Sequence, residues 1–250
     1  YYREVIEPLV GTRLGRQEID AEILDDAPGA LWKRDWIEKD RITLPSDPTE
    51  RESFLKSLRE RMKRIVVAMD PAATSSEDSD EMGIIVAGLG TDNHGYVLAD
   101  LTARLSPDQA SRRAIKAYDD WQADRIVGEV NNGGEWIGTT VSLTAKAMKL
   151  EGVRRSATIS YKAVHASRGK QTRAEPIAAL SEQHKIHHAG TFPLLEDQLC
   201  SWEPLSGDRS PDRLDAFVWA FTELVIEGSA PLIVSDAVLA RSRTPGFRNT

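Results

Sequence analysis

The sequence predicts an α/β fold in which three antiparallel strands and then parallel strands form one mixed sheet, with helices on both faces. Short apolar runs at 64–69, 82–89 and 95–101 follow one another through tight connections, as antiparallel strands do. Two later apolar runs, 123–130 and 156–164, alternate with helical patterns, which is typical of parallel βα units. With 40% hydrophobic residues among 250, the chain can bury one sizeable core.

Capping residues and helical periodicity place the helices. Ser106 followed by Pro107 predicts a helix that runs to about residue 122, because serine caps the first free amide groups and proline suits the first turn. A short amphipathic helix is expected before the first strand. The expected helices besides the one after Ser106 are 48–61, 135–149, 172–183, 193–202 and 211–227.

The composition changes near residue 60. Residues 1–60 are charged and interrupted by proline and glycine, so we expect a linker arm that is loosely ordered on its own. Residues 61–250 are expected to form the folded domain. The chain starts at Tyr1 rather than at methionine, which suggests a fragment of a longer protein. Cys200 is the single cysteine, so an internal disulfide is excluded and a reducing compartment fits. No run of about eighteen apolar residues predicts a membrane span.

Charge is distributed unevenly along the chain. The formal net charge is −7, yet the stretch 146–188 holds nine Lys or Arg and three acids. An acidic body with one basic segment suits an enzyme that gathers carboxylates around metals and holds a polyanion beside them.

Four acidic residues stand where strands end or a helix begins. Asp70 follows the first apolar run and Glu129 ends the fourth, while Asp212 and Asp215 are three residues apart and share one face of a helix. Singly, each could be a cap, a turn residue or half of a salt bridge. Together they are oxygen ligands of the kind that Mg²⁺ and Mn²⁺ prefer. We therefore expect a two-metal site, with Asp70 as the bridging ligand and Glu129 and Asp215 outside it.

Five stretches of sequence carry a family resemblance. They are 11–20 (GTRLGRQEID), 66–72 (VVAMDPA), 126–134 (IVGEVNNGG), 167–180 (SRGKQTRAEPIAAL) and 210–220 (SPDRLDAFVWA). In this order and wording they resemble the nuclease domain of the large terminase subunit of tailed bacteriophages, a member of the RNase H-like superfamily.

The resemblance implies an RNase H-like fold and a hydrolase that acts in viral genome packaging. It implies an endonuclease that cleaves double-stranded DNA by two-metal phosphodiester hydrolysis, with magnesium or manganese and little sequence specificity. Residues 1–60 would be the linker arm from a missing ATPase domain. The portal and the small terminase subunit would be further partners. The isolated domain would be a monomer without membrane contact. It would act in the cytoplasm of the bacterial host. No G-x-x-x-x-G-K-[ST] motif occurs, so this fragment should not hydrolyse ATP.

The resemblance also suggests roles for individual residues. Asp70, Glu129 and Asp215 would be catalytic metal ligands. Asp212 would be a supporting ligand, although related enzymes can carry a histidine there. Asp80 would be an auxiliary acid, unless it is only a solvated loop charge. Candidate contacts to DNA phosphates, which could otherwise form a solvated face, are Lys162, Arg168, Lys170 and Arg173.

Two other functions remain open at this point. One is an RNase H-like Holliday-junction resolvase or transposase-type core, which would share the acids. The other is a non-catalytic module that docks on DNA and the portal, with carboxylates that only stabilise loops. The histidines at 184, 187 and 188 and the tryptophans, Trp219 among them, are expected to be structural.

Overall fold

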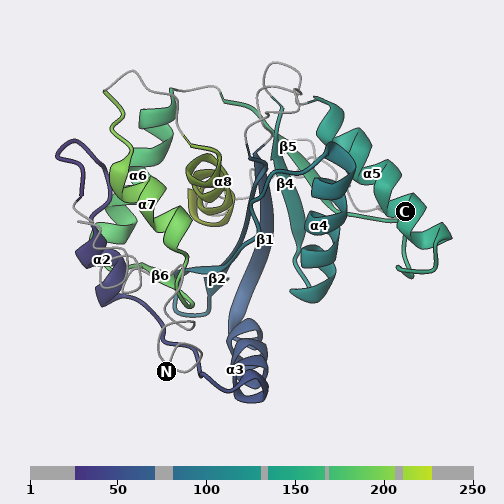
Figure 1. Cartoon of the computed structure of the whole chain (residues 1–250), viewed down its shortest axis with the longest axis horizontal. Helices are drawn as coiled ribbons and strands as arrows, with labels where there is room; N and C mark the ends of the chain where they lie inside the picture. The colour runs from purple at the N-terminus through teal and green to yellow at the C-terminus, as the bar shows by residue number, and fades with distance from the viewer. Residues whose placement is uncertain (1–25, 71–80, 131–134, 167–168, 206–210, 227–250) are drawn as a thin grey trace, which may run out of the picture.

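The computed structural model describes residues 26–70, 81–130, 135–166, 169–205 and 211–226, which form a six-stranded mixed sheet (Figure 1). The strand order is β5-β4-β1-β2-β3-β6. Strands β1, β2 and β3 pair antiparallel, whereas β4 and β5 continue parallel to β1 and β6 pairs parallel with β3. The predicted fold class is therefore confirmed. The strands are β1 (Met62–Asp70), β2 (Gly83–Gly90), β3 (Gly95–Asp100), β4 (Arg125–Glu129), β5 (Tyr161–Val164) and β6 (Ile186–His188).

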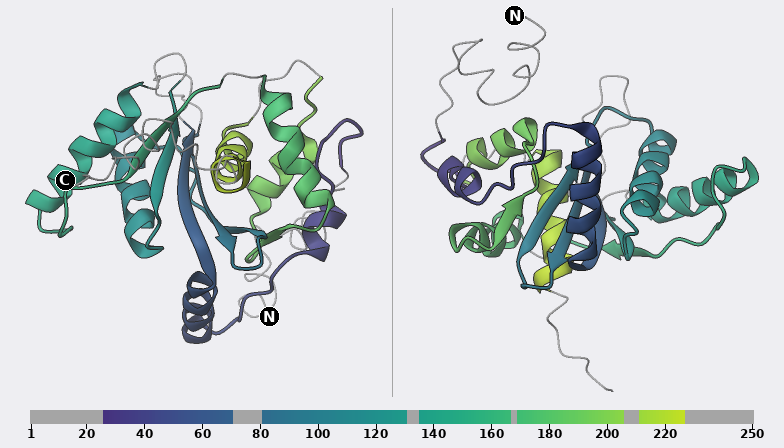
Figure 2. Two further views of the ribbon diagram at one scale, coloured as in Figure 1. Left: turned by 180° about the vertical axis from the view of Figure 1, so that it is seen from behind. Right: turned by 90° about the horizontal axis from the view of Figure 1, so that it is seen from below.

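Helices cover both faces of the sheet (Figures 1 and 2). One face carries α8, with α6, α7 and α2 outside it, while α4 and α5 lie on the other and α3 leads into β1. Their bounds are α2 (Arg34–Lys39), α3 (Pro48–Glu60), α4 (Pro107–Asp120), α5 (Glu135–Leu150), α6 (Lys170–Glu182), α7 (Pro193–Ser201) and α8 (Asp212–Phe221), which continues as a π-helix η3 (Thr222–Ile226).

Alternation along β1 divides the core into two clusters. Val66 and Ala68 face α8, whereas Ile65, Val67 and Met69 face α4, because successive side chains of a strand point to opposite faces. All ten residues of α8 are buried, so this helix is an inner layer between the sheet and the outer helices. The polar side chains of α8 are therefore held in fixed positions.

The segment before β1 packs more tightly than expected. Trp32 is fully buried, its indole nitrogen donates to the Ser181 hydroxyl at 3.0 Å, and its ring meets Phe217 edge-on. Ile37 of α2 is also buried. Residues 30–37 thus belong to the core of the domain, since large apolar side chains there complete its α8 face. Whether residues 1–60 link to an ATPase domain stays a prediction.

Two short elements escaped the sequence analysis. Strand β6 has three residues and α2 has six, too few for a periodic pattern to be recognised. The fifth strand starts at Tyr161 rather than 156, and the last predicted helix changes to π geometry at Thr222. Among the described residues, no helix is both long and apolar enough to span a bilayer.

Candidate active site

Two strands bring Asp70 and Glu129 to the same edge of the sheet. Met69 of β1 pairs with Gly128 of the parallel strand β4. Asp70 and Glu129 are the next residues of these two strands, so they occupy neighbouring positions. Both face α8, because each lies two residues beyond a side chain of that core cluster. Their exposed fractions are 7% and 8%. Two carboxylates are thus side by side at the buried ends of neighbouring strands.

The first turn of α8 adds two more carboxylates. Asp212 and Asp215 share one helix face and are 9% and 3% exposed. Gly83 of β2 pairs with Asp70, and a Cβ at Gly83 would lie 2.2 Å from the Asp212 carbonyl oxygen. Only glycine allows the helix backbone to come this close to the strand. Sequence analysis missed this role, although a glycine at the start of an apolar strand is a recognised sign of close backbone approach.

A buried arginine fixes the start of α8. Arg213 is 4% exposed; its Nε donates to Asp100 Oδ2 at 3.0 Å, and its terminal nitrogens pair with Glu81. Its backbone nitrogen donates to the Gln198 side chain at 3.2 Å. These contacts tie the helix to β3 and α7, so they help to hold Asp212 and Asp215 in place. The sequence analysis did not assign Arg213 a role.

The four carboxylates repel one another. The pKa of Asp70 is raised well above its usual range, first by burial and then by the charges of Asp215, Glu129 and Asp212, while Lys170 opposes the shift. The charges of the other three predicted acids thus reach Asp70. A buried group with several like charges around it is characteristic of functional sites.

The comparison with known families decides the assignment. Residues 67–224 match the family model described as the terminase RNaseH-like domain. The chain belongs to this family. The matched range holds all four acids, so the family and the site geometry concern the same part of the molecule.

Solved terminase nuclease domains share this fold. The nuclease domain of the P22 large terminase matches with a TM-score of 0.52 at 11% identity, over 82% of this chain and 99% of that one. A mutant nuclease domain of the large terminase subunit gp2 of bacterial virus Sf6, with manganese and β-thujaplicinol, has a TM-score of 0.52 at 13% identity, over 76% and 97%. The Mn-soaked, inhibitor-bound human cytomegalovirus terminase nuclease domain has a TM-score of 0.52 at 15% identity, over 76% and 93%. A search of curated protein sequences found no match.

Two cations of this terminase domain enter the acidic site from α6. Lys170, the first residue of that helix, places its Nζ 2.5 Å from Asp215 Oδ2. Arg173 is 8% exposed in its side chain and its Nη1 lies 3.7 Å from Glu129 Oε2, beyond hydrogen-bond distance. The Nε and Nη1 groups of Arg173 are buried and have no hydrogen-bond partner among the described residues. The sequence placed both residues in a basic segment but did not predict that they contact the acids.

A tryptophan of α8 also contacts the site. Trp219 donates its indole N–H to Glu129 Oε2 at 2.6 Å, and the Arg173 guanidinium lies 4.3 Å from the centre of its ring. We expected Trp219 to be only a core residue. Its position four residues after Asp215, on the same helix face, was the signal that could have revealed it.

Some predicted site residues lie elsewhere or are not described. Lys162 of β5 places its Nζ 2.7 Å from Glu223 Oε2, at the far end of α8 from Asp212. Asp80 and Arg168 lie outside the described residues. His188 is buried against Glu196 and His187 stacks on His94, in agreement with the structural role expected for the histidines.

The donor set of this terminase domain fits hard divalent cations. Asp70, Glu129, Asp212 and Asp215 offer only carboxylate oxygens, and a cation would relieve the repulsion that raises the pKa of Asp70. Among the described residues, no three acidic, His or Cys side chains form a ready-made ion site. Lys170 and Trp219 instead hold Asp215 and Glu129. Binding of an ion would thus require small side-chain movements.

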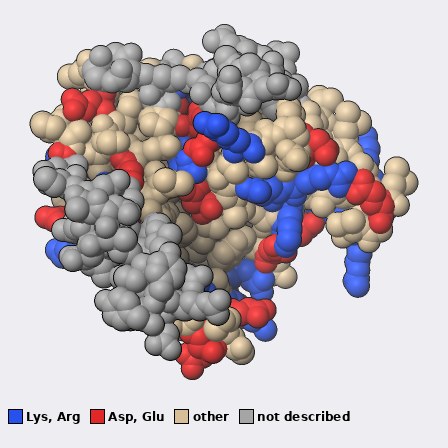
Figure 3. Space-filling model, viewed as in Figure 1, with Lys and Arg blue, Asp and Glu red and all other residues tan. Residues whose placement is uncertain are grey.

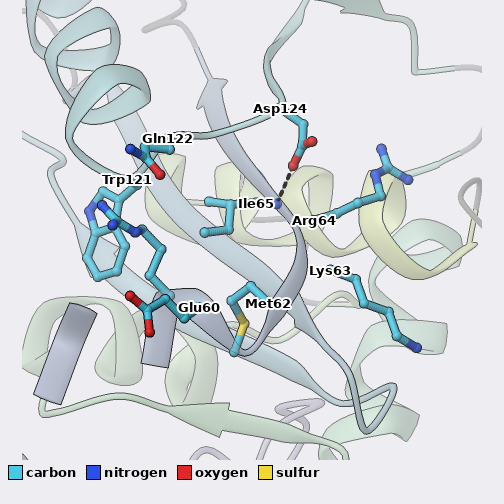
Figure 4. Close-up of a pocket in the computed structure, with 9 residues that line it drawn as sticks. Glu60, Met62, Lys63, Arg64, Ile65, Trp121, Gln122 and Asp124 are labelled. Carbon is cyan, nitrogen blue, oxygen red and sulfur yellow. Dashed lines mark hydrogen bonds between the residues drawn. The ribbon is translucent and has the colours of Figure 1, made fainter. Parts of the chain in front are cut away.

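A separate pocket lies at the opposite end of β1 (Figure 4). The Asp124 carboxylate accepts a hydrogen bond from the backbone nitrogen of Ile65 there at 2.8 Å. None of the four acids lines this pocket, so it does not belong to the candidate active site. Its lining residues are Arg59, Glu60, Met62, Lys63, Arg64, Ile65, Trp121, Gln122 and Asp124.

Proposed function

We propose that this domain is an endonuclease that cleaves double-stranded DNA by two-metal phosphodiester hydrolysis, with little sequence specificity, during viral genome packaging. The observation that carries the proposal is the convergence of four buried carboxylates, from β1, β4 and α8, on one point where their charges raise the pKa of Asp70. The match to the terminase RNaseH-like family supports a nuclease role in packaging.

Each acid has a proposed role. The charges of the other three carboxylates all act on Asp70, which would bridge two Mg²⁺ or Mn²⁺ ions, with Glu129 and Asp215 as outer ligands and Asp212 in support. Bound ions would lower the pKa of an attacking water and neutralise charge on the departing 3′ oxygen. The rigid attachment of α8 through Arg213 would keep two of the ligands in place. Asp80 remains a candidate auxiliary acid.

Arg173 is the basic residue best placed to contact the reacting phosphate. Two of its buried N–H groups have no hydrogen-bond partner in the part of the chain that the structure describes, and a guanidinium donates well to phosphate oxygens. Lys170 lies beside it, is paired with Asp215 in the free protein, and would exchange this partner for a phosphate when DNA binds. Lys and Arg side chains also form a band on the side of β4, β5 and α5 (Figure 3). Lys162 and Arg168 remain proposed phosphate contacts.

Plasmid nicking in Mn²⁺ tests the metal account. Asp70→Asn and Asp215→Asn should each abolish nicking, because each removes a charged metal ligand. Asp120→Asn is the matched control, since Asp120 is an exposed acid of α4 that pairs with Lys116. All three variants should keep the circular dichroism spectrum of the wild type. Retained cleavage by either site variant would refute the proposal.

DNA binding without cleavage tests the basic residues. In the absence of divalent ions, changing Lys170 and Arg173 together to alanine should weaken duplex binding and reduce the slope of log affinity against log salt by roughly two units. Changing Lys56 and Lys116, two exposed lysines of α3 and α4, is the control. An unchanged slope in the site variant would contradict phosphate contact.

The substrate separates this proposal from its rivals. A resolvase should prefer branched DNA, and a transposase-type core should prefer specific DNA ends. The proposed enzyme should instead cut plain linear duplex and four-way junctions at similar rates. A non-catalytic docking module should bind no Mn²⁺ at these acids. An ATPase domain joined through residues 1–60, the portal and the small terminase subunit are the proposed partners, in the cytoplasm of the bacterial host.

A further inference from the structure

Trp219 is bonded to one of the proposed metal ligands in the buried core. Its side chain is 3% exposed, and its indole nitrogen lies 2.6 Å from Glu129 Oε2. We propose that Trp219 is a positioning residue that orients the Glu129 carboxylate for metal binding, with Arg173 packed over its ring. This inference rests on the proposed two-metal function and goes beyond it by assigning a residue that holds a ligand.

The chemistry of the bond suits this role. An indole N–H can only donate, so it fixes the one Glu129 oxygen whose lone pair accepts it. A glutamate has three rotatable side-chain bonds, and a fixed partner on one oxygen restricts them. Groups that hydrogen-bond a metal-ligating side chain orient it and tune its affinity for the ion.

The helix geometry links this bond to a second ligand. Asp215 and Trp219 are four residues apart and lie on one face of α8. A single rigid helix thus carries one proposed ligand and the group that orients another ligand on β4. The hydrogen bond thereby couples the position of Glu129 to the helix that carries Asp215.

Arg173 completes the arrangement from α6. Its guanidinium lies 4.3 Å from the centre of the Trp219 ring, within the range of a cation–π contact. Its Nη1 also lies 3.7 Å from the same Glu129 oxygen that accepts the indole N–H. A positive charge over the ring strengthens the N–H as a donor, so both residues act on the same carboxylate oxygen.

Trp219→Phe isolates the contribution of the N–H group. Phenylalanine keeps an aromatic ring under Arg173 but cannot donate to Glu129. We expect Mn²⁺ binding, measured by electron paramagnetic resonance of the free ion, to weaken by about 10- to 100-fold. Nicking should need a correspondingly higher Mn²⁺ concentration, and its rate should largely recover when Mn²⁺ is saturating. Trp219→His, which offers a ring N–H, should recover part of the affinity.

Trp202→Phe is the matched control. Trp202 is also buried, at 6% exposure, but its indole nitrogen finds no hydrogen-bond partner within the described ranges. Its replacement should leave Mn²⁺ affinity unchanged. Equal loss of affinity in both tryptophan variants would show a merely structural effect and overturn the inference, as would wild-type affinity in Trp219→Phe.

Two measurements keep the test decisive. If the wild type binds no Mn²⁺, the proposed function itself fails, whereas normal binding by both wild type and Trp219→Phe removes only the role of Trp219. If Trp219→Phe does not fold, the indole N–H resonances of the wild type provide the answer. The Trp219 signal should move on titration with Mg²⁺ while the Trp202 signal stays, and an unmoved Trp219 signal would overturn the inference.

Discussion

Two clusters of charged side chains lie at opposite ends of the helix formed by α8 and η3. The buried carboxylates in them, Asp70 and Glu223, have opposite surroundings. At the N-terminal end, the charges of three further carboxylates act on Asp70, and that of Lys170 opposes them. At the C-terminal end, Glu223 is 3% exposed and accepts from Arg64 and Arg125, each at 2.9 Å, and from Lys162 at 2.7 Å. Both clusters lie against the same face of the sheet.

The difference shows that neighbouring charges decide whether the pKa of a buried carboxylate rises or falls. Burial raises the pKa of both groups. At Asp70 the neighbouring carboxylates raise it further. At Glu223 the cations Lys162, Arg125 and Arg64 outweigh burial and lower the pKa below its usual value. The Glu223 cluster is therefore complete as an ion-pair network, whereas the Asp70 cluster is relieved only by added positive charge.

The largest expected effect is the removal of the carboxylate from the complete cluster. Glu223→Ala would leave three cations on neighbouring strands without their shared partner. We expect the free energy of unfolding, measured by urea titration, to fall by about 3 kcal/mol. This value is at the lower end of the range for breaking a buried ion pair, because the cations are partly exposed. Glu151→Ala removes the exposed partner of Arg112 and should cost much less, because water screens exposed ion pairs. Equal losses would contradict the comparison.

Added metal should stabilise the protein through the Asp70 cluster and not through Glu223. Mn²⁺ at 100 times its dissociation constant should stabilise the wild type by about 2.7 kcal/mol, seen as a higher melting temperature. Asp70→Asn should lose most of this gain, whereas Glu223→Gln should keep it because Glu223 lies at the other end of α8. A similar gain in all three proteins would place the ions elsewhere.

The close approach of α8 to β2 predicts an intermediate effect. Gly83→Ala would place a methyl group against the Asp212 carbonyl oxygen and should destabilise the fold by about 1–3 kcal/mol. It should also weaken Mn²⁺ binding, because the helix must move away from Asp70. Gly169→Ala is the control, since a Cβ there meets nothing within 4 Å. An unaffected Gly83→Ala would mean that the helix packs less closely.

The smallest effect concerns the pH dependence without metal. Asp70→Asn should stabilise the protein at neutral pH on the order of 1 kcal/mol, since it removes a repelled charge. Because the folded-state pKa of Asp70 is raised, this gain should shrink as pH falls through that pKa and Asp70 becomes neutral. Glu223 has a lowered folded pKa, so its stabilisation is complete above its unfolded pKa and is lost as pH falls through the folded one. Thermal melts in EDTA at several pH values measure both.

Local patterns in the sequence determined much of this protein. Runs of apolar residues located the first five strands, and capping residues located the start of α4 at Pro107. The spacing of Asp212 and Asp215 placed both on one helix face, and the positions of Asp70 and Glu129 predicted strand ends. These features follow from the periods of helices and strands, which are properties of a few consecutive residues.

Only the tertiary structure decided which side chains contact the acids. Trp219 and Glu129 are 90 residues apart, and Lys170 and Asp215 are 45 apart. No local period relates such pairs. They meet because α8 packs on the sheet and α6 packs outside α8. The same packing requires glycine at Gly83 and buries Trp32. The sequence therefore specified the charged groups, while the packing of whole elements specified their partners and so their pKa values.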